Sequence, residues 1–420
     1  MRNKPRIRFK GFTEDWEQCK LGEIFEYLQN NTLSRDSLNY KNPNIKNIHY
    51  GDILVKFDEI LDGSNKDIPY INSELDLSKF SKSLLRDGDI VFSDTAEDDA
   101  VGKAIELQNV SVPFILSGLH TIPCRPLIPF GKGYLGNFLN SDSYRMQLRP
   151  LVQGIKVSSI SKSALKDTMI VYPKKLDEQE KIGGLFYHIS KIITLHQRKL
   201  EKLKLTKKAL LQKLFPKNGS QFPEVRFKNF CDSWKPYKLG HYFKKYQNVI
   251  YLEDDVVYKQ ISVRNNGVIE YRCSTKGKDI GRKRQYIIDT MLYPDTLTFT
   301  RQTVYEGGIG FVPKTLDGAI VTENMPLLAM RNSNKDFMMA LFNSQSYIFG
   351  VLNKNALSGS AQKALHERDW LNSVLLFPDI EEQNLIGRLI NMIDKYIDLH
   401  YRKLDKLYGV KKSLLQKMFV

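Results

Sequence analysis

The apolar residues of two segments repeat with the spacing of a coiled coil. They recur at alternating intervals of four and three residues from Ile189 to Leu214, and again from Ile393 to Met418. This heptad spacing predicts an amphipathic helix whose apolar stripe packs on another helix. A histidine and a lysine hold the same ranks in both stripes, so we expect the two helices to pair with each other. The stripe positions are Ile189, Ile193, His196, Leu200, Leu203, Lys207, Leu210 and Leu214, then Ile393, Ile397, His400, Leu404, Leu407, Lys411, Leu414 and Met418.

Local signals mark the ends of these helices. Pro173 and Pro378 precede them, and carboxylates follow in the first turns, where they suit the positive end of the helix dipole. Pro216 and the turn residues after it end the first helix, whereas Gly409 is expected to weaken the second. Each helix of about 40 residues would be roughly 60 Å long, which suits a spacer. For His196 and His400 we favour polar core residues that fix the register over metal ligands.

Shorter apolar runs predict strands in the regions between the helical segments. These runs are Ile53–Val55, Asp89–Phe92, Val256–Tyr258 and Thr296–Phe299. Asn266-Gly267, between two further apolar runs, predicts a tight hairpin turn. Both regions should therefore be mixed bodies of strand and helix.

The chain also repeats itself at long range. Pro5–Lys10 returns 218 residues later as Pro223–Lys228, and a block from Gln179 to Phe215 returns 204 residues later from Gln383 to Phe419. Units this long must each bury a core of their own, unlike the units of a solenoid. We predict an α+β protein in which two similar mixed α/β domains are separated by two long antiparallel coiled-coil spacer helices, with internal pseudo-twofold symmetry. The expected boundaries are 1–175 for the first domain, 176–217 for the central helix, 218–378 for the second domain and 379–420 for the distal helix.

The charge favours a polyanionic partner. The chain has a formal net charge of +16, and residues 174–217 carry 12 Lys and Arg against 4 Asp and Glu. The alternative is that this charge serves only solubility. An acidic stretch from Asp87 to Asp99 is expected to be a solvated loop.

Catalytic and metal-binding signatures are missing from the sequence. It has no phosphate loop, no glycine-rich cofactor turn, no His-Glu-x-x-His and no Asn-Pro-Pro-aromatic motif. Its four cysteines are scattered, which argues against structural zinc and a disulfide framework. Neither a signal peptide nor a spanning helix is recognisable, so we expect a cytoplasmic protein. We assign no catalytic residue and no metal ligand.

Two like domains on antiparallel helices could contact two DNA segments a fixed distance apart. Because the domains share a frame but differ inside it, the expected target has two different parts.

The chain resembles the specificity subunit of type I restriction-modification systems over essentially its whole length. The marks of this resemblance are Arg8-Phe9 and Arg226-Phe227, each followed by a Trp and by Lys-Leu-Gly, the segments at Gly154 and Gly359, and the Glu-Gln pairs that end at Gln179 and Gln383. The resemblance implies a non-catalytic reader of a bipartite, asymmetric DNA site, with one target-recognition domain for each half. It further implies that the helices fix the gap and dock the modification subunits.

The expected partners follow from the same resemblance. They are double-stranded DNA, two modification (methyltransferase) subunits and restriction (translocase and nuclease) subunits, and no membrane. S-adenosylmethionine, ATP and Mg would be bound by these partner subunits and no cofactor by this chain, which would be required for the DNA adenine methyltransferase and endonuclease activities of the holoenzyme. The competing interpretation is a coiled-coil protein-interaction adaptor with no DNA role.

The candidate DNA contacts are polar and basic residues of types that read base edges or phosphates. In the first domain they are Lys46, Asn47, His49, Tyr50, Arg145, Arg149, Lys156, Ser158 and Ser159. In the second domain they are Arg264, Asn265, Asn266, Lys276, Arg282, Lys283, Arg284, Arg301, Gln302, Ser360, Gln362 and Lys363.

Overall fold

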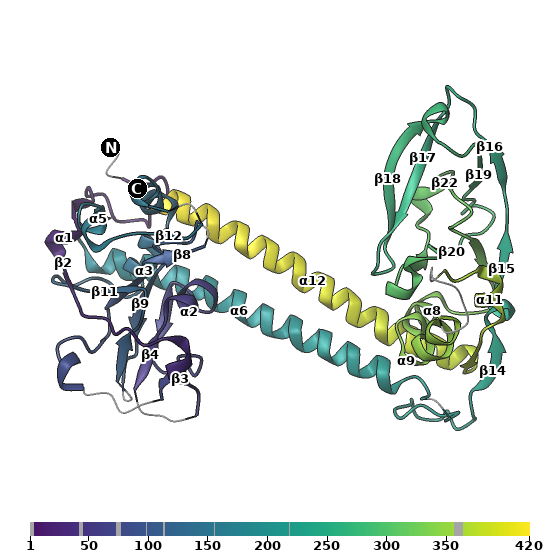
Figure 1. The fold of residues 1–420 in the computed structure, drawn as a ribbon, viewed down its shortest axis with the longest axis horizontal. Helices are drawn as coiled ribbons and strands as arrows, with labels where there is room; N and C mark the ends of the chain where they lie inside the picture. Colours follow the sequence, from purple (N-terminus) through teal and green to yellow (C-terminus); the bar gives the residue numbers. More distant parts are fainter. Residues whose placement is uncertain are drawn as a thin grey trace. The chain divides into compact units, whose positions relative to one another are not determined.

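The structure is a computed structural model that describes residues 4–41, 45–72, 77–97, 99–111, 114–154, 156–217, 219–356 and 364–420. The chain divides into two compact units (Figure 1). Unit 1 contains Met1–Arg198 and Arg402–Val420, and unit 2 contains Lys199–Tyr401. Both long helices therefore contribute residues to both units.

The inner sheet of unit 1 has five strands in the order β2-β11-β7-β9-β5. Strand β7 consists of four consecutive buried residues, which confirms the strand expected near Asp89–Phe92. The strands are β2 (Phe25–Tyr27), β11 (Thr121–Pro126), β7 (Ile90–Ser93), β9 (Ala104–Gln108) and β5 (Ile60–Asp62).

The inner sheet of unit 2 repeats this arrangement. Its order β15-β23-β20-β21 matches β2-β11-β7-β9, with antiparallel pairing throughout. The predicted likeness of the two bodies is thus confirmed, and so is the strand at Thr296–Phe299. The strands are β15 (Phe243–Tyr246), β23 (Leu327–Met330), β20 (Thr296–Phe299) and β21 (Ile309–Phe311).

The outer sheets of the two units differ. Unit 1 has four short strands, β10 (Ile115–Ser117), β4 (Lys46–Ile48), β6 (Tyr70–Ile71) and β3 (Leu38–Asn39), paired in that order. Unit 2 has five, β16 (Val249–Tyr251), β19 (Arg284–Ile287), β22 (Ile320–Val321), β17 (Val257–Val263) and β18 (Ile269–Lys276). The turn between β17 and β18 lies at Asn266-Gly267, as predicted, with a φ of 79° at Gly267.

Small two-stranded sheets and short helices complete each unit. In unit 1 these are β1 (Glu17–Lys20) with β13 (Met169–Tyr172), β8 (Thr95–Ala96) with β12 (Ser158–Ser159), and the helices α1 (Leu21–Ile24), α2 (Tyr50–Val55), α3 (Tyr134–Leu139), α4 (Asp142–Leu148) and α5 (Lys162–Lys166). In unit 2 they are β14 (Lys235–Lys238) with β24 (Val374–Phe377), and the helices α7 (Leu239–Tyr242), α8 (Lys335–Phe342), α9 (Gln345–Tyr347), α10 (Lys354–Ala356) and α11 (Glu367–Asn372).

Two local expectations were wrong. Ile53–Val55 belongs to helix α2, which begins after His49, whose ring accepts a hydrogen bond from the backbone N–H of Gly51. Asp89 lies in the interior, because its carboxylate forms a bidentate ion pair with Arg125 at 2.8 and 2.6 Å. The apolar run at Ile53–Val55 did not indicate that His49 caps a helix there. The acidic stretch did not indicate that Asp89 pairs with the distant Arg125.

The long helices are α6 (Leu176–Lys213) and α12 (Ile380–Met418). Every predicted stripe position on them is buried or half-buried, and α12 continues without a break through Gly409. In unit 1, Phe186 stacks on Phe419, and Gln197 bonds to Tyr408. In unit 2, Lys207 pairs with Asp394. Within unit 1, residue numbers rise along α6 while those of their α12 partners fall, so the helices pair antiparallel there, as predicted.

Each unit anchors the start of one long helix and the end of the other. Arg8 forms a bidentate ion pair with Glu178 in the first turn of α6, and Arg226 repeats it with Glu382 in α12. The end of α12 places Phe419 against Tyr134 in the core of unit 1. Phe215, just after α6, packs in the same way on Phe337 and Trp234 in the core of unit 2.

The backbone next to these helix ends is duplicated too. Ile7 donates its N–H to the carbonyl oxygen of Lys417 at 3.0 Å in unit 1. In unit 2 the equivalent bond runs from Val225 to Lys213, also at 3.0 Å. The first contact joins residues from opposite ends of the chain, whereas the second spans a short connection.

Candidate nucleic-acid interface

Two candidate residues of unit 1 lie in its interior. Lys46 and Asn47, in β4, are 3% and 0% exposed. The Lys46 ammonium donates to the carbonyl oxygens of Gly63 at 2.5 Å and Asn65 at 3.1 Å, and burial lowers its pKa. Asn47 Oδ1 accepts from Asn31 Nδ2 at 2.6 Å. These contacts favour a role in holding the outer sheet together, so neither residue is carried into the proposals below.

Two other candidates of unit 1, His49 and Tyr50, lie beside a surface histidine. His49 is buried at the start of α2, and its burial lowers its pKa. Tyr50 is half-buried, with its ring 5.3 Å from that of the exposed His120. His120 adopts a φ of 56°, which is uncommon for a residue other than glycine and holds its ring over this surface.

His120 links this region to the candidate loop near Ser158 and Ser159. Its Nδ1 atom lies 3.3 Å from an Asp94 carboxylate oxygen and 3.4 Å from the Thr95 hydroxyl. Thr95 in turn faces Ser159 across the β8–β12 pair. A series of contacts through His120 and Thr95 thus links Tyr50 to Ser159, which the sequence separates by more than a hundred residues.

The loop before β12 is closed by backbone bonds. Gln153 and Ser159 exchange both of their N–H···O bonds, at 2.9 and 2.8 Å, and the exposed Lys156 lies between them. Arg149 is also exposed, whereas Arg145 is half-buried and donates to the carbonyl oxygens of Asp99 and Val101. Lys156 and Arg149 remain available as cations, while Arg145 holds a neighbouring loop.

The candidate hairpin turn of unit 2 is exposed, but its polar groups are already engaged. Arg264 donates to Glu270 at 2.6 Å, Asn265 donates to Glu306 at 2.5 Å, and Asn266 accepts from the backbone of Val268 at 3.1 Å. These bonds stabilise the turn.

The candidate basic cluster of unit 2 is similarly occupied. Lys283 donates to Asp254 at 2.5 Å, and Arg282 lies 3.4 Å from Glu323. Arg284 lies over the ring of Tyr286, 5.7 Å from its centre.

Arg301 is nearly buried and belongs to an ion-pair group with Glu367 and Lys245. Burial alone would raise the pKa of Glu367, but hydrogen bonds from Lys245 and Arg301 outweigh it and lower this pKa to about 2. Because these charges are paired with one another and largely buried, the group favours a role in stabilising unit 2 over a role in binding DNA.

The other candidates of unit 2 have different surroundings. Lys276 and Gln302 are exposed, and Lys276 makes no ion pair with any described residue. Ser360, Gln362 and Lys363 lie outside the described residues.

Sequence reasoning missed Lys259 and Arg272 as candidates. Both lie on the β17–β18 hairpin, are exposed, and have no ion pair within the described part of the chain. The signal that could have found them is the polar pattern of the two strands on either side of the predicted Asn-Gly turn.

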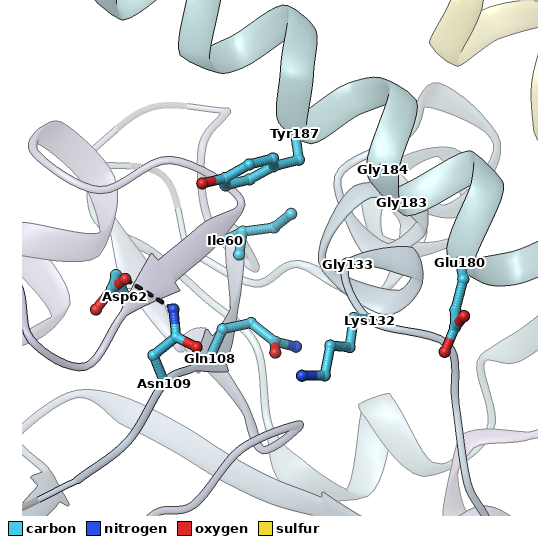
Figure 2. A pocket seen from close by; sticks show the side chains of 10 residues that line it. All are labelled: Ile60, Asp62, Gln108, Asn109, Lys132, Gly133, Glu180, Gly183, Gly184 and Tyr187. Atoms are coloured by element: carbon cyan, nitrogen blue, oxygen red, sulfur yellow. Dashed lines mark hydrogen bonds between the residues drawn. The ribbon is translucent and has the colours of Figure 1, made fainter.

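Unit 1 also contains an open pocket of about 610 Å³, beside the first turns of α6 (Figure 2). Tyr187 lies next to Ile60, and Asn109 donates to Asp62 at 2.9 Å. The polar side chains that line it, such as Lys132 and Glu180, are spread around the rim. This arrangement does not place a nucleophile beside a base, so the pocket does not suggest a catalytic centre.

Groups of His, Cys, Asp and Glu that could hold a metal ion are absent from the described residues. Among the same residues, none of the helices is both long and apolar enough to cross a membrane.

Comparisons with known proteins agree on one family. The model of the type I restriction modification DNA specificity domain matches residues 13–205. The putative type I restriction enzyme MjaX specificity subunit of Methanocaldococcus jannaschii is 22% identical, over 96% of this chain and 92% of its own length. The MjaVIII specificity subunit of the same organism is 21% identical, over 64% of this chain and 65% of its own.

The fold is also similar to that of a solved structure. The crystal structure of the type I restriction-modification S subunit from M. genitalium matches with a TM-score of 0.58 at 13% identity, covering 99% of both chains. Residues 13–205 match a type I restriction-modification DNA specificity domain, and the chain as a whole is similar to the specificity subunits of these systems. A specificity subunit is non-catalytic, which accords with the lack of catalytic motifs in the sequence. Its two target-recognition domains correspond to the bodies built on the matching inner sheets.

Proposed function

We propose that this specificity subunit reads a bipartite, asymmetric DNA site, with each unit reading one half. The observation that supports this most directly is the contrast between the sheets. The inner sheets share the order and pairing of four strands, to which unit 1 adds β5, while the outer sheets differ in strand number, strand length and exposed residues. A shared scaffold with different outer surfaces suits two readers of two different sequences.

The long helices would serve as a spacer between the two recognised segments. α6 is one uninterrupted helix of 38 residues and α12 one of 39, and both contribute to unit 1 and to unit 2. Because an α-helix rises by about 1.5 Å per residue, the number of residues in these helices would set the gap in the site.

The same helices would dock two modification subunits. Ile192 and Leu195 are exposed on α6, and the equivalent positions on α12 are the exposed Tyr396 and Leu399. These side chains lie off the stripe that joins the helices, and exposed apolar pairs of this kind mark partner surfaces. Their repetition at the same ranks supports two copies of one partner.

The reactions would take place on the partner subunits. The modification subunits would use S-adenosylmethionine to methylate adenine, and the restriction subunits would use ATP and Mg for translocation and cleavage. This chain would determine the DNA sequence that the complex recognises for both activities. A role on duplex DNA would place it in the cytoplasm.

The decisive experiment selects sites from random duplexes. The chain would be assembled with its modification subunits and incubated with the duplexes at several salt concentrations, and the bound DNA would be sequenced. We expect two enriched segments of different sequence at a fixed spacing. An adaptor without a DNA role would enrich no sequence motif, and that result would overturn the proposal.

A length variant tests the spacer. One heptad inserted between Arg198 and Lys199, with another between Tyr401 and Arg402, would lengthen both helices by about 10 Å. At roughly 3.4 Å per base pair, the selected gap should grow by about three base pairs. An insertion in α6 alone is the control, and it should disturb the pairing. An unchanged gap in the double insertion would contradict the spacer role.

A further inference from the structure

The β17–β18 hairpin is a feature of unit 2 that the described residues of unit 1 do not share. Its strands have 7 and 8 residues, whereas the described strands in the outer sheet of unit 1 have 2 or 3. The two strands run side by side as a long ribbon (Figure 1). Because the inner sheets agree, a difference in the sequence that the two units read must arise from unshared elements such as this hairpin.

One row of side chains leaves the core and continues into solvent along the hairpin. Ile261 and Ile269 are buried in the core of unit 2. Side chains two residues apart on a strand share a face, and the register pairs Lys259 with Ser274 and Val257 with Lys276. All four residues of these two pairs are exposed. The hairpin therefore extends a row of exposed side chains beyond what packing requires, and all of them except Val257 are polar or basic.

A β-bulge lies at the point where this row leaves the core. Gln260 pairs with Cys273, whereas Ile261 pairs with Tyr271, which leaves Arg272 as an extra residue in β18. Bulges increase the local twist and redirect side chains, often beside functional sites. Arg272 and Tyr271 are both exposed, and the Tyr271 hydroxyl donates to Ser274 at 3.0 Å.

The cations on the two strands of this hairpin make no ion pair within the described residues, unlike the cation in its turn and those of the neighbouring surface. Lys259, Arg272 and Lys276 make no ion pair with any residue that the structure describes. The carboxylate on these two strands belongs to Glu270, which is already bound to Arg264 at 2.6 Å. Three free cations on a narrow ribbon complement a polyanion.

We propose that the β17–β18 hairpin enters the major groove at the half-site of unit 2, where Arg272, Lys259 and Lys276 contact the edges of the bases. The major groove of B-form DNA accommodates a two-stranded ribbon, and Arg and Lys donate to guanine O6 and N7. This assignment rests on the proposed function and adds the element and the residues that determine one half of the site.

The test compares charge-removing variants of the full chain, each assembled with the modification subunits. Arg272→Gln, Lys259→Gln and Lys276→Gln would be made singly and together, and the sites that they bind would be selected from random duplexes. We expect the triple variant to lose sequence preference in one segment and to keep it in the other. Arg272→Gln alone should weaken binding to the wild-type site by about tenfold or more.

Two further variants keep the interpretation sharp. Lys244→Gln removes an exposed strand cation from the inner sheet and should leave the selected motif unchanged. Arg272→Lys keeps the charge but loses the fork geometry, so it should alter the preferred base while largely preserving the salt dependence. Thermal unfolding of every variant should match that of the wild-type chain, because the substituted side chains are exposed.

The outcomes separate this inference from the function beneath it. If the wild-type complex selects a bipartite site and the triple variant selects the same one, the hairpin assignment fails and the function stands. A uniform loss of affinity with an intact motif would also overturn base reading, because it indicates phosphate contacts. Loss of the modification subunits from the triple variant would identify the hairpin as a protein-docking surface and would overturn the proposal as well.

Discussion

Two buried glutamates carry much of the anchoring at the level of single residues. The side chains of Glu178 and Glu382 are each 1% exposed, and each binds an arginine through both carboxylate oxygens. The copies differ in one respect. Trp234 donates its indole N–H to Glu382 at 3.1 Å, whereas the indole N–H of Trp16 has no partner among the described residues.

This difference leads to the first prediction. Glu382→Gln should lower the free energy of unfolding by about 3–5 kcal/mol, because it leaves the guanidinium of Arg226 partly buried without a counter-charge. Glu178→Gln should lower it by less, since that carboxylate has one partner fewer. Urea unfolding of the variants measures both effects. The control, Glu381→Gln, changes an exposed neighbour and should shift stability by less than about 0.5 kcal/mol.

Glu367 predicts a dependence of stability on acid. Its pKa of about 2 in the folded chain lies below the ordinary value for a glutamate, so its ion pairs stabilise unit 2 fully above that ordinary value. This contribution is lost as the pH falls towards 2. Between pH 5 and pH 2 the melting temperature of the wild-type chain should fall. In Glu367→Gln the share of this fall that comes from unit 2 should be smaller. An identical pH profile in the variant would contradict this assignment.

Residue type alone did not predict the surroundings of the candidate interface residues. Lys46 and Arg301 are basic, but their environments could not be read from the sequence, because their partners Gly63 and Glu367 are distant in the chain. Arg272 was missed for the opposite reason. Its exposure depends on a bulge that appears only when the register of two strands is known.

At the level of elements, adjacent glycines in the second turn of α6 have opposite roles. A Cβ atom on Gly183 would lie 2.0 Å from the carbonyl oxygen of Lys132, whereas one on Gly184 would meet nothing within 4 Å. Gly387, the equivalent of Gly183 in α12, is similarly close to the backbone of Phe337. At these glycines the long helices thus approach the backbone just before α3 and at the start of α8 too closely for a side chain.

A pair of alanine substitutions tests this close approach. Gly183→Ala should destabilise unit 1 by about 1–3 kcal/mol, because the extra methyl group forces the backbones apart. Gly184→Ala should be neutral or stabilising by up to about 1 kcal/mol, since alanine favours the helix. Denaturant unfolding followed by circular dichroism measures both changes. Equal effects from the two substitutions would show that the contact is not tight.

The long helices were the most predictable elements, because a heptad stripe of eight positions is a strong periodic signal. Their ends were marked by prolines and acidic residues close to the observed starts. Short elements were less predictable. α2 depends on a cap at His49, and the close approach at Gly183 depends on the distant backbone of Lys132, so neither could be found from local sequence.

At the level of the whole molecule, the repeated apolar pairs predict the composition of the complex. Ile192→Glu with Leu195→Glu should remove one modification subunit, and Tyr396→Glu with Leu399→Glu should remove the other. Native mass spectrometry of the assembled complex should show a loss of one copy in each case. Thr206→Glu, at an exposed polar position on α6, should retain both copies. Full occupancy in both double variants would place the docking surface elsewhere.

The internal duplication predicted the architecture. Repeats at two different offsets, 218 and 204 residues, distinguished the repeated segments from the regions between them, which share little sequence. The frame residues became the anchors of the helices, such as Arg8 and Phe419 and their repeats. The interiors, which share little sequence, contain both the matching inner sheets and the differing outer sheets. Residues that repeat between the halves carry no information about the segments that do not repeat. The β17–β18 hairpin could therefore be predicted only from its turn residues.

The bond between Ile7 and Lys417 has a consequence for connectivity. It is the counterpart of the bond from Val225 to Lys213, which spans eleven intervening residues. Ile7 and Lys417, in contrast, lie near opposite ends of the chain. Joining residue 420 to residue 1 would leave nine residues between Lys417 and Ile7, so two added residues would equal the natural connection.

We therefore expect the fold not to depend on which of the two connections is covalent. A rearranged chain opened near Gly219, with residues 420 and 1 joined, should fold with the same spectrum and select the same DNA. A half-chain ending near Lys217 should pair with a second copy of itself, which takes the place of the missing half. The two identical domains would then select a symmetric DNA site instead of an asymmetric one.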